Sequence, residues 1–133
     1  MLSLPSSVRI FAAREAVDFR KGFDGLTAVV RDGFQDDPFA GHFFLFFNRR
    51  RDRVKILWWD RNGFWLFYKR LERGTFERIE ASGSRVEIDR ARLAMLLEGI
   101  DAKRSKFREH FVREVRIPSR GARDVPQPAG VDR

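Results

Sequence analysis

Four arginines within five residues form the densest group of chemically active side chains in the sequence. Between two apolar stretches stand Arg49, Arg50, Arg51 and Arg53, followed by Lys55 one step inside the second stretch. A guanidinium group donates paired hydrogen bonds to phosphate, and each neutralised phosphate releases counterions. The spacing therefore predicts a site for a polyanion such as nucleic acid. The alternative is an ordinary charged hairpin end that keeps a sheet edge soluble.

Two more cations, Arg20 and Lys21, fall in the first turn of a predicted helix. The helix dipole disfavours positive charge at that end, and such a conflict often marks a functional position. An anion held by both side chains and the helix N-terminus would resolve the conflict. Ion pairs with Asp18 or Asp24 would resolve it equally well. With these two, the predicted nucleic-acid-binding residues are Arg49, Arg50, Arg51, Arg53, Lys55, Arg20, Lys21, Lys69 and Arg70.

Aromatic residues crowd the segments on both sides of the arginines. Neighbouring residues of a strand point to opposite faces, so Trp58 and Trp59 cannot both enter one core. Either both faces are covered, or one face exposes rings on which bases could stack. Core packing is the preferred interpretation, with some surplus aromatic surface left for a protein partner. The predicted partner-binding residues are Trp58, Trp65 and Tyr68.

Residues for enzyme chemistry are poorly organised in the sequence. A two-metal nuclease needs about three carboxylates that converge on one site, and the available aspartates show no spacing that singles out such a set. The sequence holds no cysteine and only two histidines, so zinc sites of the Cys/His type are excluded. No phosphate-binding glycine loop is present. We predict no catalytic residue, metal or cofactor. The aspartates considered are Asp18, Asp24, Asp52 and Asp60.

Charge is concentrated in two blocks of the chain. The 133 residues carry a formal net charge of +8, and residues 49–73 and 102–123 hold all of the positive excess. Such segregation favours a binding surface over a general solubility charge. Hydrophobic residues make up 43% of the chain, enough for the core of one compact domain. No apolar run approaches the ~20 residues of a membrane span, and no signal peptide is recognisable, so we expect a cytoplasmic protein.

The first part of the chain predicts a strand and a helix. Residues 8–12 have the composition of a short strand. Asp18 is placed to cap a helix that runs through Phe34, because apolar residues then recur at steps of three and four. Gly22 and Gly25 weaken this helix, and close packing against another element is the expected reason for them.

The middle of the chain predicts an antiparallel meander. Its strands are residues 42–48, 54–60 and 64–71. Asn62 and Gly63 form a strong hairpin signal, since both tolerate the positive φ of a tight turn. The sheet that carries the arginines should therefore be continuous and stiff.

The rest of the chain predicts weaker strands and a second helix. Residues 75–79 and 85–88 read as short strands, and Asp89 caps a helix that Gly99 ends. Ile100 is placed to fold back on its last turn. The predicted buried stripe of this helix consists of Leu93, Leu96 and Leu97.

Together the elements predict a single α+β domain over residues 1–101. Its antiparallel sheet has four to five strands around the central meander and is flanked by two helices. Residues 102–133 form a basic extension, first helical through the spacing of Phe107, Phe111 and Val115, and then disordered from Pro118.

Four blocks of the sequence carry a family resemblance. Residues 17–26, 48–55, 59–64 and 68–71 resemble the small accessory proteins called TnpB in the sixty-six family of bacterial insertion sequences. These proteins are unrelated to the RNA-guided nucleases that share the name. The similarity covers residues 4–101 in the right order.

The resemblance implies a protein encoded beside a larger transposase, which contributes to transposition without the strand-transfer active site. It implies DNA, the transposase and other products of the same mobile element as partners. Phe19 departs from the family, in which methionine is common at this position. Turn geometry explains Asp60 and Gly63, whereas surface cations contribute little to folding. The recurring positions are Asp18, Arg20, Lys21, Asp24, Asn48, Arg49, Arg50, Lys55, Asp60, Gly63, Tyr68, Lys69 and Arg70.

The sequence thus predicts a non-catalytic accessory factor in DNA transposition. It would bind DNA, the transposase or both through the basic aromatic hairpin sheet. One alternative is a protein adaptor that docks the transposase without binding DNA, and a second is a metal-dependent nuclease that uses the aspartates. The sequence carries no signal for the oligomeric state.

Overall fold

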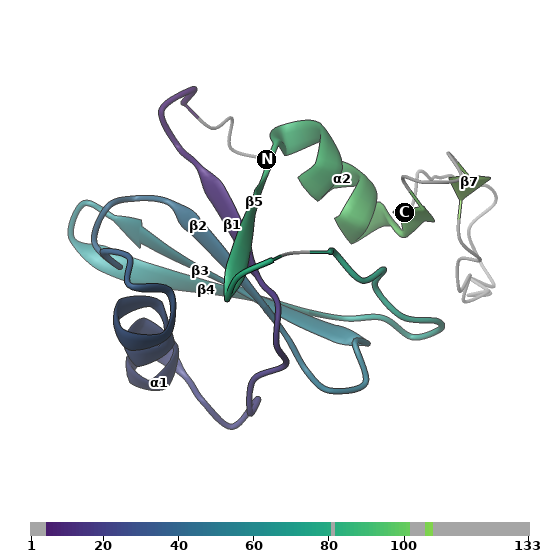
Figure 1. Ribbon diagram of the computed structural model, residues 1–133, viewed down its shortest axis with the longest axis horizontal. Helices are drawn as coiled ribbons and strands as arrows, with labels where there is room; N and C mark the ends of the chain where they lie inside the picture. Colours follow the sequence, from purple (N-terminus) through teal and green to yellow (C-terminus); the bar gives the residue numbers. More distant parts are fainter. Residues whose placement is uncertain (1–4, 81, 102–105, 108–133) are drawn as a thin grey trace, which may run out of the picture.

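A five-stranded sheet forms the centre of the computed structural model, which describes residues 5–80, 82–101 and 106–107. The strand order is β4-β3-β2-β1-β5, and only the β1–β2 pair is parallel (Figure 1). The predicted α+β fold with its central meander is confirmed, as a mixed sheet. The strands are β1 (Ile10–Ala13), β2 (Phe43–Phe47), β3 (Arg53–Asp60), β4 (Gly63–Arg70) and β5 (Arg85–Ile88).

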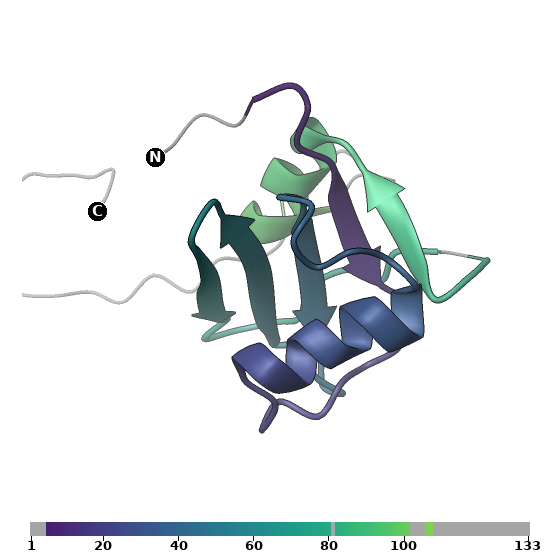
Figure 2. The same ribbon diagram turned by 90° about the vertical axis from the view of Figure 1, so that its left-hand side faces the viewer.

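The two predicted helices cover opposite faces of the sheet. On one face lies α1 (Phe23–Ala28), which continues as the π-helical segment η1 (Val29–Phe34). On the other face lies α2 (Arg90–Glu98) (Figure 2). Each helix therefore closes a separate apolar core. The core under α1 includes Leu26, Val30, Phe34, Phe44, Phe46 and Leu57, and the core under α2 includes Leu45, Phe47, Ile56, Phe76, Leu93 and Leu96.

Side chains of β3 alternate between these two cores. Trp58 packs against Phe43 on the α2 side, with ring centroids 5.4 Å apart. Trp59 contacts Phe39 and Phe64, with both pairs of ring centroids 4.9 Å apart. The prediction that the two tryptophans point to opposite faces is confirmed. Two covered faces explain why the strands read as nearly continuous apolar runs.

The segment before α1 differs from the prediction. The helix begins at Phe23, and its N-cap residue Gly22 makes no side-chain hydrogen bond. Asp18 does not cap it. Its carboxylate instead accepts the backbone N–H of Arg20 at 2.9 Å, so residues 18–20 form a local turn. Arg20 and Lys21 therefore precede the helix and do not lie in its first turn, and Asp18 pairs with Arg20 at 2.6 Å.

Gly25 has a packing role, although its neighbour is the preceding loop and not another element. A Cβ atom at Gly25 would lie 2.9 Å from Cβ and Cγ of Lys21. At Gly22 a Cβ atom would meet nothing within 4 Å. Close packing therefore explains Gly25 alone.

The hairpin between β3 and β4 is present, but its left-handed residue is not the predicted one. Asp60 pairs with Gly63, which leaves Arg61 and Asn62 in the turn. Arg61 has φ 59°, whereas neither Asn62 nor Gly63 has positive φ. The local sequence predicted the turn correctly but assigned the positive φ to the wrong residues.

Residues 75–79 form no strand in the structure. No strand ladder pairs their backbone; the Phe76 N–H instead donates a hydrogen bond to Arg51 O at 2.7 Å. The Phe76 ring fills the core under α2. An anchored loop thus replaces the predicted ladder.

The second helix follows the prediction. The Asp89 carboxylate accepts the Arg92 N–H at 2.7 Å, and Gly99 ends the helix with φ 81°. Leu93 and Leu96 are buried, and Leu97 is half-buried beside them.

After α2 the structure describes two short strands, β6 (Ile100–Asp101) and β7 (Lys106–Phe107), which pair with each other. Phe107 was predicted to be helical, but it lies in β7 and pairs with Ile100. The remainder of the predicted basic extension, at 102–105 and 108–133, lies outside the described residues, and so do Phe111 and Val115, the other two positions of the predicted helix. Within the described part of the chain, no helix has the length and apolarity needed to cross a membrane.

Candidate nucleic-acid interface

Predicted cations from three segments meet at one end of β3 and β4, on the face that α1 covers. Arg53 and Arg70 are cross-strand partners. The Arg53 guanidinium donates to the Tyr68 hydroxyl at 2.9 Å. The Tyr68 ring in turn meets the Phe19 ring edge-on, with centroids 5.8 Å apart. Phe19 brings its neighbour Arg20 to the same end of the sheet.

The loop that carries Arg20 and Lys21 is fastened across this end. The Val17 N–H donates to Phe47 O at 3.0 Å, at the last residue of β2. The Lys55 ammonium donates to the carbonyls of Phe19 and Lys21, at 2.8 Å each. Two sets of cations that the sequence placed separately, in the loop and in the β2–β3 turn, therefore lie at the same end of the sheet.

The β2–β3 turn itself is organised by Asn48. Its side-chain amide donates to the Asp52 carboxylate at 2.6 Å, and its side-chain carbonyl accepts the Arg53 N–H at 3.0 Å. The hydrogen bond from Asn48 holds the pKa of Asp52 below its usual range, with help from the charges of Arg50 and Arg53. This fixed turn leaves Arg49 and Arg50 exposed at its apex.

Arg49 and Arg50 are the cations best placed for a ligand. Within the described part of the chain, neither guanidinium has a hydrogen bond or an ion pair. Each therefore keeps all of its donors for an external acceptor.

Arg51 and Lys55 occupy different positions from those predicted. Arg51 is 7% exposed, and its guanidinium donates to the carbonyls of Phe76 and Glu77. Lys55 is 6% exposed and uses its ammonium to hold the loop. Their donors face the protein interior because both side chains bridge the sheet to a neighbouring loop. We leave both residues out of the candidate interface.

Lys69 also lies apart from the group. It pairs with Val54, whose side chain belongs to the core under α2, so Lys69 points to the opposite face from Arg70. Its ammonium donates to Leu97 O at 2.8 Å. The cations that remain together form what we call the cationic end, and all of them are exposed except the half-buried Arg53. They are Arg20, Lys21, Arg49, Arg50, Arg53 and Arg70.

Carboxylates neutralise the cationic end only in part. Asp18 pairs with Arg20 at 2.6 Å, and Glu72 pairs with Arg70 at 3.0 Å. The hydrogen bond from Arg20 lowers the pKa of Asp18 well below its usual range, so this carboxylate is charged at neutral pH. With Asp52, three carboxylates face six cations, and exposed ion pairs of this kind are weak. A surplus of positive charge stays available to a polyanion.

Comparison with known proteins places this fold in a family. The family model of IS66 Orf2-like proteins matches residues 8–107, which include all five sheet strands and both helices. The chain belongs to the family of IS66 Orf2-like proteins. The predicted resemblance is confirmed, and membership implies an accessory role associated with transposition.

Relatives of this IS66 Orf2-like chain occur in Sinorhizobium fredii (strain NBRC 101917 / NGR234). "Uncharacterized protein y4hO" is 38% identical over 101 residues, which are 76% of this chain and 88% of the relative. "Uncharacterized protein y4jC" is 33% identical over 106 residues, or 80% of this chain and 91% of the relative. No solved structure matches the chain.

Aromatic side chains of the IS66 Orf2-like fold divide between the two faces of β4. Trp65 is 53% exposed and stacks on Phe67, with centroids 6.1 Å apart and planes 7° apart. Trp58, the cross-strand partner of Trp65, is half-buried. Tyr68 points to the opposite face, where it joins Arg53. The three predicted partner-binding residues therefore do not share one surface. Phe67 is not among the predicted partner-binding residues, although its spacing of two from Trp65 places both rings on one face of the strand.

The aspartates considered for a nuclease do not converge. Asp18 and Asp52 hold Arg20 and Asn48 near one end of the sheet, whereas Asp60 accepts the Trp65 indole N–H at the far end of β3. Among the described residues, no group of three His, Cys, Asp or Glu side chains could hold a metal ion.

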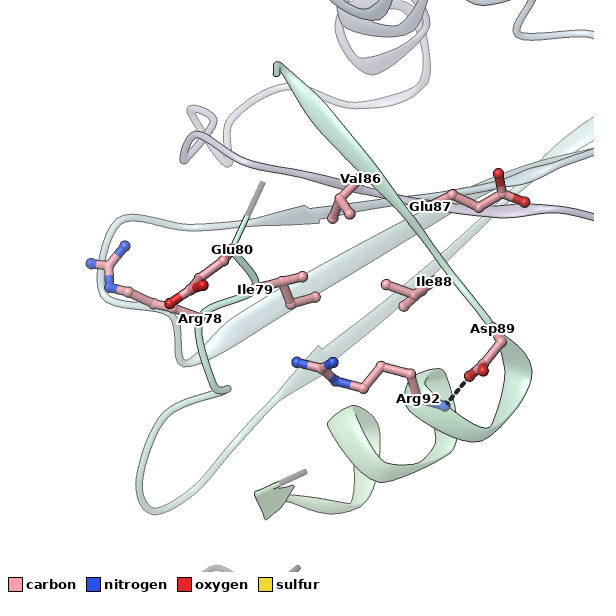
Figure 3. A pocket seen from close by; sticks show the side chains of 8 residues that line it. All are labelled: Arg78, Ile79, Glu80, Val86, Glu87, Ile88, Asp89 and Arg92. Atoms are coloured by element: carbon pink, nitrogen blue, oxygen red, sulfur yellow. Dashed lines mark hydrogen bonds between the residues drawn. The ribbon is translucent and has the colours of Figure 1, made fainter. Parts of the chain in front are cut away.

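A cavity of about 340 Å³ lies away from the cationic end, between β5 and the start of α2 (Figure 3). Arg78 and Arg92 line it together with Glu80 and Glu87. Because its lining carries side chains of both charge signs, this cavity offers a phosphate no clear surplus of positive charge. Asp89, at its rim, is used by the capping hydrogen bond to Arg92.

Proposed function

We propose that this IS66 Orf2-like protein is a non-catalytic accessory factor of transposition that binds the DNA backbone through the cationic end. The observation that carries the proposal is the exposed pair Arg49 and Arg50, whose guanidiniums have no acceptor among the described residues. Four more cations surround them on a rigid sheet end. Guanidinium groups that keep their hydrogen-bond donors unused in this way suit phosphate oxygens.

The geometry supports contact with backbone phosphates more than recognition of base sequence. The turn at Asn48–Arg53 is braced by its own side chains, so little order has to be gained when a phosphate binds. Arg20 and Lys21 extend the positive surface from the turn across the sheet end. Phosphate contacts fix position without reading sequence.

Replacing Arg49 and Arg50 together by alanine is expected to weaken DNA binding and its salt dependence. Fluorescence anisotropy with a labelled duplex measures affinity across a salt series, using element-end and random sequences. For the wild type, log K should fall linearly with log salt, and the double variant should reduce the slope by about 2. The matched control is Arg31→Ala with Arg61→Ala, two exposed arginines outside the cationic end.

The control removes the same charge, so its slope should stay close to that of the wild type. Equal slopes for both double variants would show that the cationic end is not the DNA site. Absence of DNA affinity in the wild type would overturn the proposed function.

Asp18→Asn is expected to strengthen DNA binding. The amide keeps an oxygen for the Arg20 N–H but removes the charge that pairs with the Arg20 guanidinium. The freed guanidinium should increase the salt slope by up to about 1 in the same titration. Asp32→Asn is the control, because it frees Arg31 away from the cationic end. If the salt slope increased equally in both variants, the effect would come from the change in net charge and not from the cationic end.

The second candidate function is a protein adaptor that docks the transposase. The exposed stack of Trp65 and Phe67 favours it, because a solvated aromatic pair is typical of a protein contact. An adaptor would show no DNA affinity alone and would bind purified transposase with an affinity that Arg49→Ala leaves unchanged.

A further inference from the structure

The strand β4 is a long edge that the structure leaves unprotected. Its eight residues pair with β3 in an unbroken register, and among the described residues no strand lies on its other side. It contains no proline, and its register shows no bulge. Natural proteins usually shorten, bend or charge such edges, because an open edge is a template for another strand.

The register identifies which backbone groups of β4 are open. Asp60 pairs with Gly63 next to the turn, and the Leu71 N–H donates to Asp52 O at the other end. Backbone groups alternate in direction along an antiparallel pair, so odd-numbered residues of β4 face β3. The N–H and C=O groups that point outward belong to Phe64, Leu66, Tyr68 and Arg70.

Apolar side chains flank these open groups. Trp65 and Phe67 are 53% and 40% exposed on the α2 side, where they stack on each other. Phe64 and Leu66 lie half-buried on the α1 side. Between residues 64 and 68 the strand carries no charge. An apolar strand is therefore the occupant that this edge fits.

We propose that β4 pairs with β4 of a second copy of the chain, antiparallel about a two-fold axis at Leu66. This register sets outward-facing residues opposite one another, as the backbone pattern requires. It places Trp65 of one copy opposite Phe67 of the other, and Phe64 opposite Tyr68. Cross-strand aromatic pairs of this kind stabilise sheets. The result is one continuous ten-stranded sheet, twice the five strands of one copy.

The charges at the ends of β4 fit the same register. Lys69 would lie opposite Gly63 of the second copy, and Arg70 opposite Asn62. A shift by one pair toward the turn would set Arg61 against Lys69, which is unfavourable for like charges. A shift by one pair in the other direction would place Trp65 opposite Lys69 of the second copy, and the aromatic pair of Trp65 with Phe67 would be lost. The strand is thus most complementary to itself with Leu66 at the centre.

Sedimentation equilibrium of the full chain tests the dimer without DNA. The wild type should show about twice the 15.6 kDa mass of one chain. Trp65→Glu with Phe67→Glu should give a monomer with an unchanged circular dichroism spectrum. Phe23→Glu, which charges another half-exposed aromatic position, should stay dimeric. A monomeric wild type at all concentrations would overturn the proposal, and so would mass gained only after transposase is added.

Single cysteines test the register, because the chain contains none of its own. Leu66→Cys should give a disulfide-linked dimer on mild oxidation, since the two copies of residue 66 are directly opposite. Phe64→Cys and Tyr68→Cys should stay unlinked. Linking at 64 or 68 in place of 66 would contradict this pairing. Because the readouts are mass and cross-linking, they are independent of the DNA titrations that test the proposed function.

Discussion

Replacing Arg51 by alanine is expected to lower the free energy of unfolding by about 3 kcal/mol. The buried guanidinium donates to the carbonyls of Phe76 and Glu77 and lies 4.2 Å from the centroid of the Phe47 ring. Truncation leaves those carbonyls without their charged donor in a buried site. Loss of the cation–π contact adds to the effect.

Arg49→Ala and Arg50→Ala are the matched controls for Arg51→Ala. All three residues are arginines of one turn, but the first two are exposed and should each change stability by less than about 0.5 kcal/mol. Urea unfolding followed by tryptophan fluorescence measures all three. Arg51→Gly separates the side chain from the backbone, because Arg51 has φ 59° and glycine adopts this conformation without strain. Similar decreases in the free energy of unfolding for the alanine variants at all three positions would contradict the structural role of Arg51.

Replacing Lys55 by methionine is expected to lower the free energy of unfolding by about 2 kcal/mol. Methionine keeps the apolar stem but removes the ammonium that donates to the Phe19 and Lys21 carbonyls. It also removes a charge 4.9 Å from the centroid of the Phe19 ring. The loop at Arg20 should then lose its attachment to the sheet.

Two further measurements make the Lys55 prediction specific. Lys69→Met removes an exposed ammonium that donates to a single carbonyl, so its effect on stability should be less than about 1 kcal/mol. Because Lys55 positions the loop and does not face solvent, Lys55→Met should also weaken DNA binding, and hydrogen exchange should accelerate at residues 19–21. Unchanged exchange there would show that other contacts hold the loop.

Much of the fold was accessible from sequence because its signals are local. The meander followed from apolar runs separated by turn residues, and α2 followed from Asp89 and Gly99 at its ends. The parallel pairing of β1 with β2, by contrast, joins segments about 33 residues apart, such as Ile10 and Phe43, and no local pattern encodes it. Residues 75–79 look like a strand, but the carbonyls of Phe76 and Glu77 accept hydrogen bonds from Arg51 of a distant turn and not from a neighbouring strand.

The candidate site was predicted in composition but not in geometry. Charge density identified Arg49 and Arg50 correctly as exposed cations, yet it could not separate them from Arg51. What separates them is the left-handed conformation of Arg51, which turns its side chain inward toward Phe47. Likewise, nothing in the local sequence shows that Lys55 reaches across the sheet to the loop at Phe19.

The position of β1 also limits how this chain folds as it is synthesised. One neighbour of β1 is β2, but the other is β5, whose Ile88 pairs with Ile10. A nascent chain that has emerged only through β4 therefore leaves β1 as an unpaired apolar edge of the sheet, because β5 is still missing. Until residue 88 has emerged from the ribosome, both β4 and β1 are open sheet edges. Each of them could then pair with another nascent chain on the same polysome.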